Sequence, residues 1–520
     1  MIQKNNIMKT TKTFLTLIFS LFFLFGKAQL NETNIQKLDS IFQKALIDWN
    51  VPGMAIAIVS SDSVWLSKGY GVTDITTRQA VDANTLFALA SNTKAFTSTA
   101  LAMLADEGKI NWNQKVVEIL PWFKLYNPYV TSEMTVEDLL SHRSGLKTFS
   151  GDLIWYGSTY SREEIIRKVQ YLQPVYGFRE HFGYSNLMFI TAGELVPAIT
   201  GRSWDDFVQQ QILDALGMNR STLHVSELHN LDNIAQPHTY VSDELRQIPW
   251  LDWDNIGPAG SLISSANDMA KWLQMNLSYG IVGQDTLVSK KQLHELWSPR
   301  TIIDVSAGSA AMFPETNFKS YGLGWSLMDY NGYKVIGHNG GYDGMISQTF
   351  FVPEANLGFV IMTNALSTLY YPLYYHTLDE LLGVEKKRNW NDDLLKVIRR
   401  NEERQKEQIK SLEAKRVLNT KPSLSLDQYA GIYGGKVYDT VKIAVKNNIL
   451  ELQFGRSPDF FAHLEHWQYE TFQIEFKAFP SLPKGYVTFE IDRNGEVSEM
   501  EIFLDNPDFD FTELDLKKLD

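Results

Sequence analysis

The spacing of apolar residues predicts a helix followed by a β-hairpin near the start of this chain. Between residues 38 and 46, apolar side chains recur every three or four positions, which is typical of the buried face of a helix, and Asn31 or Thr33 would cap it. Two runs rich in β-branched and aromatic residues follow, at Met54–Val59 and Val64–Ser67, with polar residues between them. This pattern predicts two antiparallel strands joined by a turn.

Helical periodicity dominates the middle of the chain, and strand-like runs return near residue 340. We expect helices at Leu187–Ile199, along the apolar face that runs from Phe207 to Leu216, and at Ala266–Leu277, and strands at Lys334–Ile336, Ser347–Val352 and Gly358–Thr363. Strands at both ends of this region, with helices between them, predict one antiparallel sheet flanked by helices. The expected fold class is therefore α/β, with an additional helical subdomain.

A highly charged segment without glycine or proline covers residues 385–417, and we interpret it as a solvated connecting helix rather than a partner-binding arm. Beyond it the chain alternates apolar and polar residues. Expected strands are Val441–Val445, Ile449–Phe454, Tyr486–Ile491 and Val497–Leu504, with Asn494-Gly495 as a hairpin turn between the last two. This region predicts a small β domain, a barrel or a sandwich.

The first residues resemble a secretory signal. Three lysines precede the apolar run Phe14–Phe25, and the small residues of Gly26-Lys27-Ala28 follow it. The run is short for a membrane span, which needs about 20 residues, so we favour cleavage near Ala28 over an uncleaved membrane anchor. We therefore expect a periplasmic or secreted protein whose only membrane association would be through an uncleaved signal.

These patterns divide the chain into four parts. We expect a signal peptide (residues 1–28), an α/β domain (30–385), a charged helical linker (386–420) and a small β-barrel domain (421–520). A length of 520 residues with 44% hydrophobic residues fits two or more packed domains. The absence of cysteine excludes disulfides and a thiol nucleophile, and the net charge of −13 disfavours nucleic acid as a partner. The sequence does not predict the oligomeric state.

Without cysteine, covalent catalysis would depend on serine, threonine or lysine. The chain has neither a Gly-x-Ser-x-Gly nor a His-Glu-x-x-His motif, and we expect no metal and no organic cofactor. Ser-x-x-Lys occurs three times, as Ser91…Lys94, Ser144…Lys147 and Ser481…Lys484. The third pair encloses a proline and the second a glycine, whereas the first opens a segment with high helix propensity.

Ser91 and Lys94 would share one face of a helix, about 5 Å apart. A lysine with its ordinary pKa of about 10.4 is a poor base, but burial lowers that pKa and frees the lone pair. Lys94 could then take the proton of the Ser91 hydroxyl. The alternative is that Ser91 merely caps the helix and that Lys94 is solvated.

Two further motifs could complete such a site. In Tyr184-Ser185-Asn186, the phenol could move a proton between nucleophile and leaving group, and the amide could orient Lys94 and the substrate; the alternative is a buried tyrosine with an N-capping asparagine. In His338-Asn339-Gly340-Gly341, expected at a strand end, the Gly341 N–H could join that of Ser91 in an oxyanion hole, where each donor is worth about 3 kcal/mol. His338 could hold a leaving group or a carboxylate, although an ordinary glycine turn is the more common explanation of this motif when it is taken alone.

In this order, Ser-x-x-Lys, Tyr-x-Asn and His-x-Gly resemble the serine β-lactamase-related and penicillin-binding-protein-like family, which includes class C β-lactamases, D-alanyl-D-alanine carboxypeptidases, D-aminopeptidases and esterases. The resemblance covers residues 33–385. Further matching segments are Pro52-Gly53-Met54, Leu139–Leu146, Leu216-Gly217-Met218, Pro258–Leu262, Ser264–Met269, Tyr321–Trp325 and Thr363-Asn364. The C-terminal region resembles the lipocalin-like β domain of one branch of this family.

The resemblance implies that Ser91 is acylated, that Lys94 accepts its proton and that Tyr184 is the second base or proton shuttle. It also implies that Asn186 and the strand glycines contact substrate. His338 replaces the lysine of the Lys-Thr-Gly element in true β-lactamases, and a mostly neutral imidazole would not bind the β-lactam carboxylate well. We therefore expect a peptidase, perhaps for peptides with D-residues, or an esterase, with a β-lactamase or a catalytically silent peptidoglycan- or peptide-binding protein as alternatives.

Overall fold

We describe the protein from a computed structural model, in which residues 30–241, 243–385 and 387–519 are placed. The predicted signal peptide lies outside these residues. Among the helices that the structure describes, none is both long enough and apolar enough to cross a bilayer. Every residue in which the sequence predicts chemistry lies within the described ranges.

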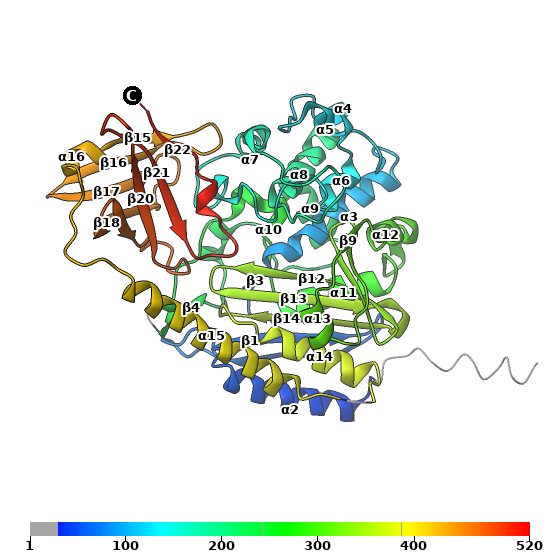
Figure 1. Cartoon of the computed structure of the whole chain (residues 1–520). Helices are drawn as coiled ribbons and strands as arrows, with labels where there is room; N and C mark the ends of the chain where they lie inside the picture. The colour runs from blue at the N-terminus through cyan, green and yellow to red at the C-terminus, as the bar shows by residue number, and fades with distance from the viewer. Residues whose placement is uncertain (1–29, 242, 386, 520) are drawn as a thin grey trace, which may run out of the picture.

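An eight-stranded antiparallel sheet forms the centre of the first domain (Figure 1). Its spatial order is β2 (Val64–Gly71), β1 (Gly53–Val59), β14 (Leu357–Thr363), β13 (Met345–Val352), β12 (Tyr333–Tyr342), β11 (Ser326–Tyr330), β10 (Lys319–Tyr321) and β9 (Thr301–Ile303). Strand β1 pairs with β14, with Met54 opposite Thr363. The sheet thus joins strands from the two ends of the domain, as the sequence predicts.

Both faces of the central strands are buried. In β1, Ala55 and Ala57 face one hydrophobic core, whereas Ile56 and Ile58 face the other. The first core also contains α11, and the second contains α2 and α14; their bounds are α11 (Ala266–Leu277), α2 (Glu32–Asp48) and α14 (Tyr370–Leu381). Because neighbouring strand residues point to opposite faces, this alternation fixes the register of the sheet between two helical layers.

A mostly helical region covers the sheet on the side of α11 and provides most of the candidate site (Figure 1). Its elements are η1 (Ala90–Asn92), α3 (Thr93–Asp106), α4 (Val116–Ile119), α5 (Pro128–Glu133), α6 (Val136–Leu140), η2 (Asp152–Ile154), α7 (Arg162–Lys168), η3 (Val169–Tyr171), α8 (Asn186–Thr200), α9 (Trp204–Val208), η4 (Gln209–Leu213), η5 (Val225–Asn230), η6 (Asp254–Ile256), α10 (Gly257–Gly260) and α12 (Lys290–Leu296). The helix α13 (Ala307–Met312) lies on the opposite side of the sheet, beside α14, where Phe313 stacks on Tyr375. The helix predicted along Phe207 to Leu216 is α9 followed by a π-helical turn, η4.

Short elements complete the first domain. Three two-stranded ribbons are β3 (Phe87–Ala88) with β6 (Ile263–Ser264), β4 (His238–Val241) with β5 (Glu244–Gln247), and β7 (Ile281–Val282) with β8 (Asp285–Thr286), and η7 (Pro353–Ala355) joins β13 to β14. One prediction needs correction: the sequence places His338 to Gly341 just beyond a strand that ends at Ile336, but β12 continues to Tyr342. These residues pair with β13 and form no turn, because the reversal comes at Asp343 and Gly344.

The charged segment after the sheet is one helix, α15 (Trp390–Ala414), which leads to a closed antiparallel barrel (Figure 1). The barrel strands are β15 (Gly431–Gly434), β16 (Val441–Lys446), β17 (Ile449–Phe454), β18 (Phe461–Gln468), β19 (Thr471–Ile474), β20 (Gly485–Ile491), β21 (Val497–Leu504) and β22 (Leu516–Leu519), with α16 (Leu426–Tyr429) and η8 (Phe511–Glu513) beside them. Alternate residues, such as Phe472, Phe489 and Ile502, fill its interior. The predicted α/β fold and C-terminal β-barrel are confirmed.

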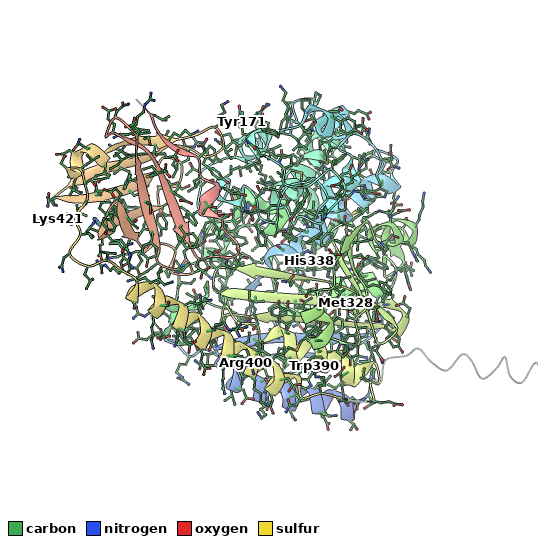
Figure 2. All side chains as sticks on the ribbon, viewed as in Figure 1. Tyr171, Met328, His338, Trp390, Arg400 and Lys421 are labelled. Carbon is green, nitrogen blue, oxygen red and sulfur yellow. The ribbon has the colours of Figure 1, made fainter. Side chains whose placement is uncertain are left out.

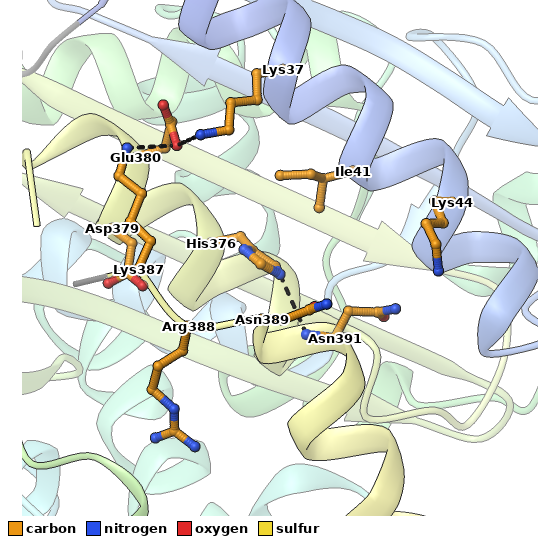
Figure 3. Close-up of a pocket in the computed structure, with 10 residues that line it drawn as sticks. All are labelled: Lys37, Ile41, Lys44, His376, Asp379, Glu380, Lys387, Arg388, Asn389 and Asn391. Carbon is orange, nitrogen blue, oxygen red and sulfur yellow. Dashed lines mark hydrogen bonds and ion pairs between the residues drawn. The ribbon is translucent and has the colours of Figure 1, made fainter. Parts of the chain in front are cut away.

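Figure 3 shows a hollow between α2, α14 and the start of α15 that is rich in basic side chains. These cations already have anionic partners: Lys37 and Lys387 lie 2.7 and 2.8 Å from the same Glu380 carboxylate, and Arg388 lies 2.9 Å from Asp393. The charges therefore hold the start of α15 against the layer formed by α2 and α14.

Candidate active site

Ser91 lies in the 3₁₀ turn η1, immediately before α3. The preceding residue, Ala90, has a φ of +45°, a left-handed conformation that costs energy for any residue with a Cβ and that neighbouring contacts must maintain. The Thr93 hydroxyl donates to the Ala90 carbonyl at 2.6 Å, and the Asn92 amide donates to the Ser347 hydroxyl of β13 at 2.8 Å. These contacts fix the turn, and with it Ser91, against the sheet.

Lys94 is fully buried, and its Nζ lies 2.9 Å from Ser91 Oγ, 2.7 Å from Asn186 Oδ1 and 2.8 Å from the Ala259 carbonyl oxygen. A neutral amine has two hydrogens and one lone pair. If the hydrogens point to the amide and carbonyl oxygens, which can only accept, the lone pair faces the Ser91 hydroxyl. The geometry thus suits a base rather than a structural cation.

The surroundings also favour the neutral amine. Burial holds the pKa of Lys94 well below its usual value, and the Asp152 carboxyl opposes this shift without reversing it. No charged partner in the described chain lies within ion-pair distance of Lys94. Burial thus favours the neutral form of Lys94, which is the form that can accept a proton.

Tyr184 lies beside both Ser91 and Lys94. Burial raises the pKa of its phenol, while a side-chain hydrogen bond with Ser91 acts in the opposite direction. The ring lies 4.8 Å from Lys94 Nζ and 4.1 Å from the His142 ring, measured to the centroid in each case. A neutral phenol here can donate its hydrogen to an oxygen or nitrogen leaving the reacting centre.

His338 lies where the sheet meets the helical region (Figure 2), with its ring 6.1 Å from that of Tyr184. Burial lowers the pKa of His338 to about 3, so the imidazole is neutral. Its Nδ1 lies 2.6 Å from the Asn339 carbonyl, which can only accept, so Nδ1 holds the proton and Nε2 accepts from the Tyr321 hydroxyl at 2.8 Å. Both ring nitrogens are engaged here, and the predicted contact of His338 with substrate stays a prediction.

The strand glycines bring β12 close to the nucleophile. A Cβ on Gly340 would lie 2.1 Å from the Leu89 carbonyl oxygen and 2.9 Å from Ser91 N, so no other residue fits without displacing the turn. A Cβ on Gly341 would meet nothing nearer than Ile346, at 3.7 Å. The close approach of β12 to the turn with Ser91 thus requires a glycine at position 340. The oxyanion hole formed by the backbone amides of Ser91 and Gly341 stays a prediction.

The structure brings Ser91, Lys94, Tyr184 and Asn186 together and separates the two other Ser-x-x-Lys pairs from them. Lys147 forms an ion pair with Asp510 of the barrel, and the Ser481 hydroxyl donates to Asp343. Both pairs therefore belong to the contact between the two domains. Context, not the four-residue pattern, distinguishes the first pair.

Sequence reasoning did not single out three site residues. His142 and Tyr321 lie in segments that match the family, and they pack around Tyr184 and His338. Asp152 accepts a hydrogen bond from the Asn186 amide at 2.7 Å, and no motif contains it. A search for family-matching aromatic positions could have found the first two, but Asp152 has no local signal.

Comparison with known proteins gives the class of this chain. Residues 38–378 match the family model described as Beta-lactamase, and residues 415–518 match a domain of unknown function (DUF3471). Since the first match covers more than half of the chain, the protein belongs to the β-lactamase family, whose members are serine hydrolases and penicillin-binding-protein-like proteins.

Particular relatives support this assignment. The chain is 31% identical to unguisins hydrolase ungD′ of Aspergillus campestris over 376 residues, which cover 68% of this chain and 67% of that protein. It is 25% identical to protein flp of Staphylococcus aureus (strain COL) over 356 residues, 66% of each chain. The octameric penicillin-binding protein homologue from Pyrococcus abyssi shares the fold, with a TM-score of 0.59, 22% identity, and coverage of 93% of this chain and 100% of that one.

Proposed function

We propose that the protein is an exported hydrolase that forms an acyl-enzyme on Ser91 and cleaves a peptide amide or an ester. The observation that supports this most directly is the buried amine of Lys94, 2.9 Å from Ser91 Oγ. Its lowered pKa, and the lack of an ion-pair partner within the part of the chain that the structure describes, suit a general base. Relatives named as hydrolases agree with an enzymatic role.

In the proposed reaction, Lys94 Nζ takes the hydroxyl proton as Ser91 Oγ attacks the carbonyl carbon. The carbonyl π electrons move to oxygen, where the amides of Ser91 and Gly341 would stabilise the negative charge. Collapse of the tetrahedral intermediate breaks the bond to the leaving group, which takes a proton from Tyr184, and the Lys94 ammonium returns a proton to the Tyr184 oxygen, so that both groups are neutral again. Water then attacks the acyl-enzyme, regenerates Ser91 and releases an acid.

A peptide or ester substrate fits the site better than a β-lactam. Recognition of the β-lactam carboxylate calls for a cation on this strand, and His338 is neutral, with a pKa of about 3. We expect hydrolysis of p-nitrophenyl acetate or of D-alanyl peptides to exceed that of nitrocefin. A faster rate with nitrocefin would favour the β-lactamase alternative.

Export is a separate part of the proposal, supported by the basic start and the apolar run Phe14–Phe25. Fractionation of cells that express the full chain, with the N-terminal sequence of the mature protein determined, tests it. We expect the protein in the periplasm or medium, beginning near residue 29. Recovery of the uncleaved chain from the cytoplasm would contradict export.

Labelling with a fluorescent fluorophosphonate tests the nucleophile. We expect the wild type to gain one label, located on Ser91 by peptide mass spectrometry, and Ser91→Ala to lose both label and activity by about 10³-fold or more. Ser144→Ala, in a second Ser-x-x-Lys pair, is the matched control and should label normally. Full labelling of Ser91→Ala would refute Ser91 as the nucleophile, and no labelling of the wild type would favour a catalytically silent binding protein.

A further inference from the structure

A buried carboxyl that the proposed reaction does not use lies directly behind the base. Asp152, at the start of η2, is 3% exposed, and its Oδ2 accepts from Asn186 Nδ2 at 2.7 Å. Asn186 Oδ1 lies 2.7 Å from Lys94 Nζ. The three side chains therefore form one buried chain of hydrogen bonds that ends at the amine.

These hydrogen bonds determine the orientation of the Asn186 side-chain amide. A carboxylate can only accept, so it selects the orientation in which Nδ2 points to Asp152 and Oδ1 points to Lys94. In the opposite orientation, an N–H group would face the amine and compete for its lone pair. With the orientation selected by Asp152, Asn186 and the Ala259 carbonyl take the two amine hydrogens, and the lone pair is left for Ser91.

The barrel holds the loop that contains Asp152. Glu513 in η8 accepts from the backbone N–H of Gly151 at 2.9 Å and from the Tyr438 hydroxyl at 3.0 Å. On the same loop, the Tyr156 ring stacks on Phe509 of the barrel, with centroids 4.0 Å apart. The loop is thus fixed on both sides of Asp152 by residues of the C-terminal domain.

We infer that Asp152 is a positioning residue for Lys94, acting through the Asn186 amide and held in place by Glu513 of the barrel. The inference rests on the proposed role of Lys94 as the base. It also gives the C-terminal domain a part in the reaction, since that domain supports the innermost hydrogen-bond chain of the site.

The negative charge of Asp152 should also affect the pKa of Lys94, and this second effect can be measured. Burial raises the pKa of Asp152 to about 7, while Trp155, Asn186 and Lys94 oppose the shift. The titratable groups that face Asp152 are Lys94, Tyr184, Tyr438 and Glu513, and those that face Lys94 also include His142 and His338. The carboxylate raises the pKa of Lys94, so its removal should let the amine stay neutral at lower pH.

Two substitutions test orientation and charge. Asp152→Ala removes both the acceptor for Asn186 Nδ2 and the charge, and we expect kcat/KM for p-nitrophenyl acetate to fall about 10- to 100-fold, mainly through kcat, with a matching fall in the rate of fluorophosphonate labelling. Asp152→Asn loses the charge, and because its side-chain amide can present either its oxygen or its NH2 group to Asn186, it no longer selects one Asn186 orientation. We expect its kcat to fall less than that of Asp152→Ala and the acid limb of the pH profile to move to lower pH.

Asp343→Asn is the matched control. Asp343 is also a buried carboxyl between the domains, and it accepts from Tyr156 at 2.8 Å, but no hydrogen bond connects it to Lys94. We expect a lower melting temperature and an unchanged acid limb. Glu513→Ala should lower kcat/KM in the same way as Asp152→Ala but less, and Glu513→Gln, which still accepts from Gly151, should restore it.

The outcomes distinguish this inference from the proposed function. If the wild type does not label on Ser91, the proposed function fails. If the wild type labels and a folded Asp152→Ala labels equally fast, only the positioning role is overturned. An equal shift of the acid limb in Asp343→Asn, or full activity of Glu513→Ala, would also overturn it.

Discussion

Among single residues, Lys94 combines a position that is costly for a charged amine with a clear chemical use. An ammonium group buried in this way loses its hydration, and among the described residues no anion within ion-pair distance replaces it. The neutral form avoids that cost and is the form that can accept a proton. The same burial thus explains the reactivity of the site and predicts a measurable effect of pH on stability.

Burial keeps the folded pKa of Lys94 below 10.5, so between these two pKa values the unfolded chain binds a proton that the folded chain does not. The free energy of unfolding should therefore rise with pH across that range, by up to about 1.4 kcal/mol per unit. The Lys94→Met variant has no amine that titrates, so its free energy of unfolding lacks this pH-dependent contribution. Urea denaturation at several pH values from about 7 to 10 should show the stability difference moving in favour of the wild type. Parallel stability curves would contradict a neutral buried amine.

Among the elements, β12 is a strand of the sheet that packs directly against the turn with Ser91. Its backbone passes so near η1 that a methyl group at Gly340 has no room. The strand edge and the turn with Ser91 are therefore one rigid unit. A substitution at this contact should therefore change the rate of the reaction without removing or adding a titratable group.

Gly340→Ala should push the Leu89 carbonyl and the Ser91 amide away from β12. We expect the protein to be destabilised by about 1–3 kcal/mol, as for other overpacked sites, and kcat/KM to fall about 100-fold. Gly308→Ala in α13, where the new Cβ would have no neighbour closer than 4.0 Å, is the control. Normal activity of Gly340→Ala would mean that β12 can retreat from the turn.

The sequence predicted these elements well where a local pattern specifies them. The predicted helix Ala266–Leu277 and strands Ile449–Phe454 and Val497–Leu504 have the same bounds as α11, β17 and β21, since period and turn residues are local properties. The strand with His338 was predicted too short, because its glycines favour a turn locally and only pairing with β13 keeps them extended. Ser91 and Lys94 were found because, among the three Ser-x-x-Lys pairs, only theirs opens a segment with high helix propensity.

Across the whole molecule, the two domains are joined by aromatic contacts as well as by polar ones. Tyr156 of the first domain packs against Phe509, Phe479 and Phe460 of the barrel, with ring centroids 4.0, 5.1 and 5.9 Å away. Contacts of this kind could not be predicted from the sequence, because their partners lie about 300 residues apart and no local pattern joins them. Asp152 and Glu513 escaped prediction for the same reason.

Tyr156→Ala should remove most of this aromatic contact. We expect a loss of about 3–5 kcal/mol and a change from one calorimetric transition to two, as the domains begin to unfold separately. Tyr240→Ala, at an exposed tyrosine of the first domain, is the control and should keep a single transition. A single unshifted transition in Tyr156→Ala would show that the domains are joined by other contacts.

The pairing of β1 with β14 has a consequence for how the chain reaches its folded state. During synthesis, a strand whose seven residues are all destined for the interior emerges long before the neighbour that will cover it. Contacts between residues so distant in sequence slow folding and leave apolar surface exposed to other molecules. We expect chaperones to bind the newly made Gly53–Val59 segment until synthesis has passed Thr363.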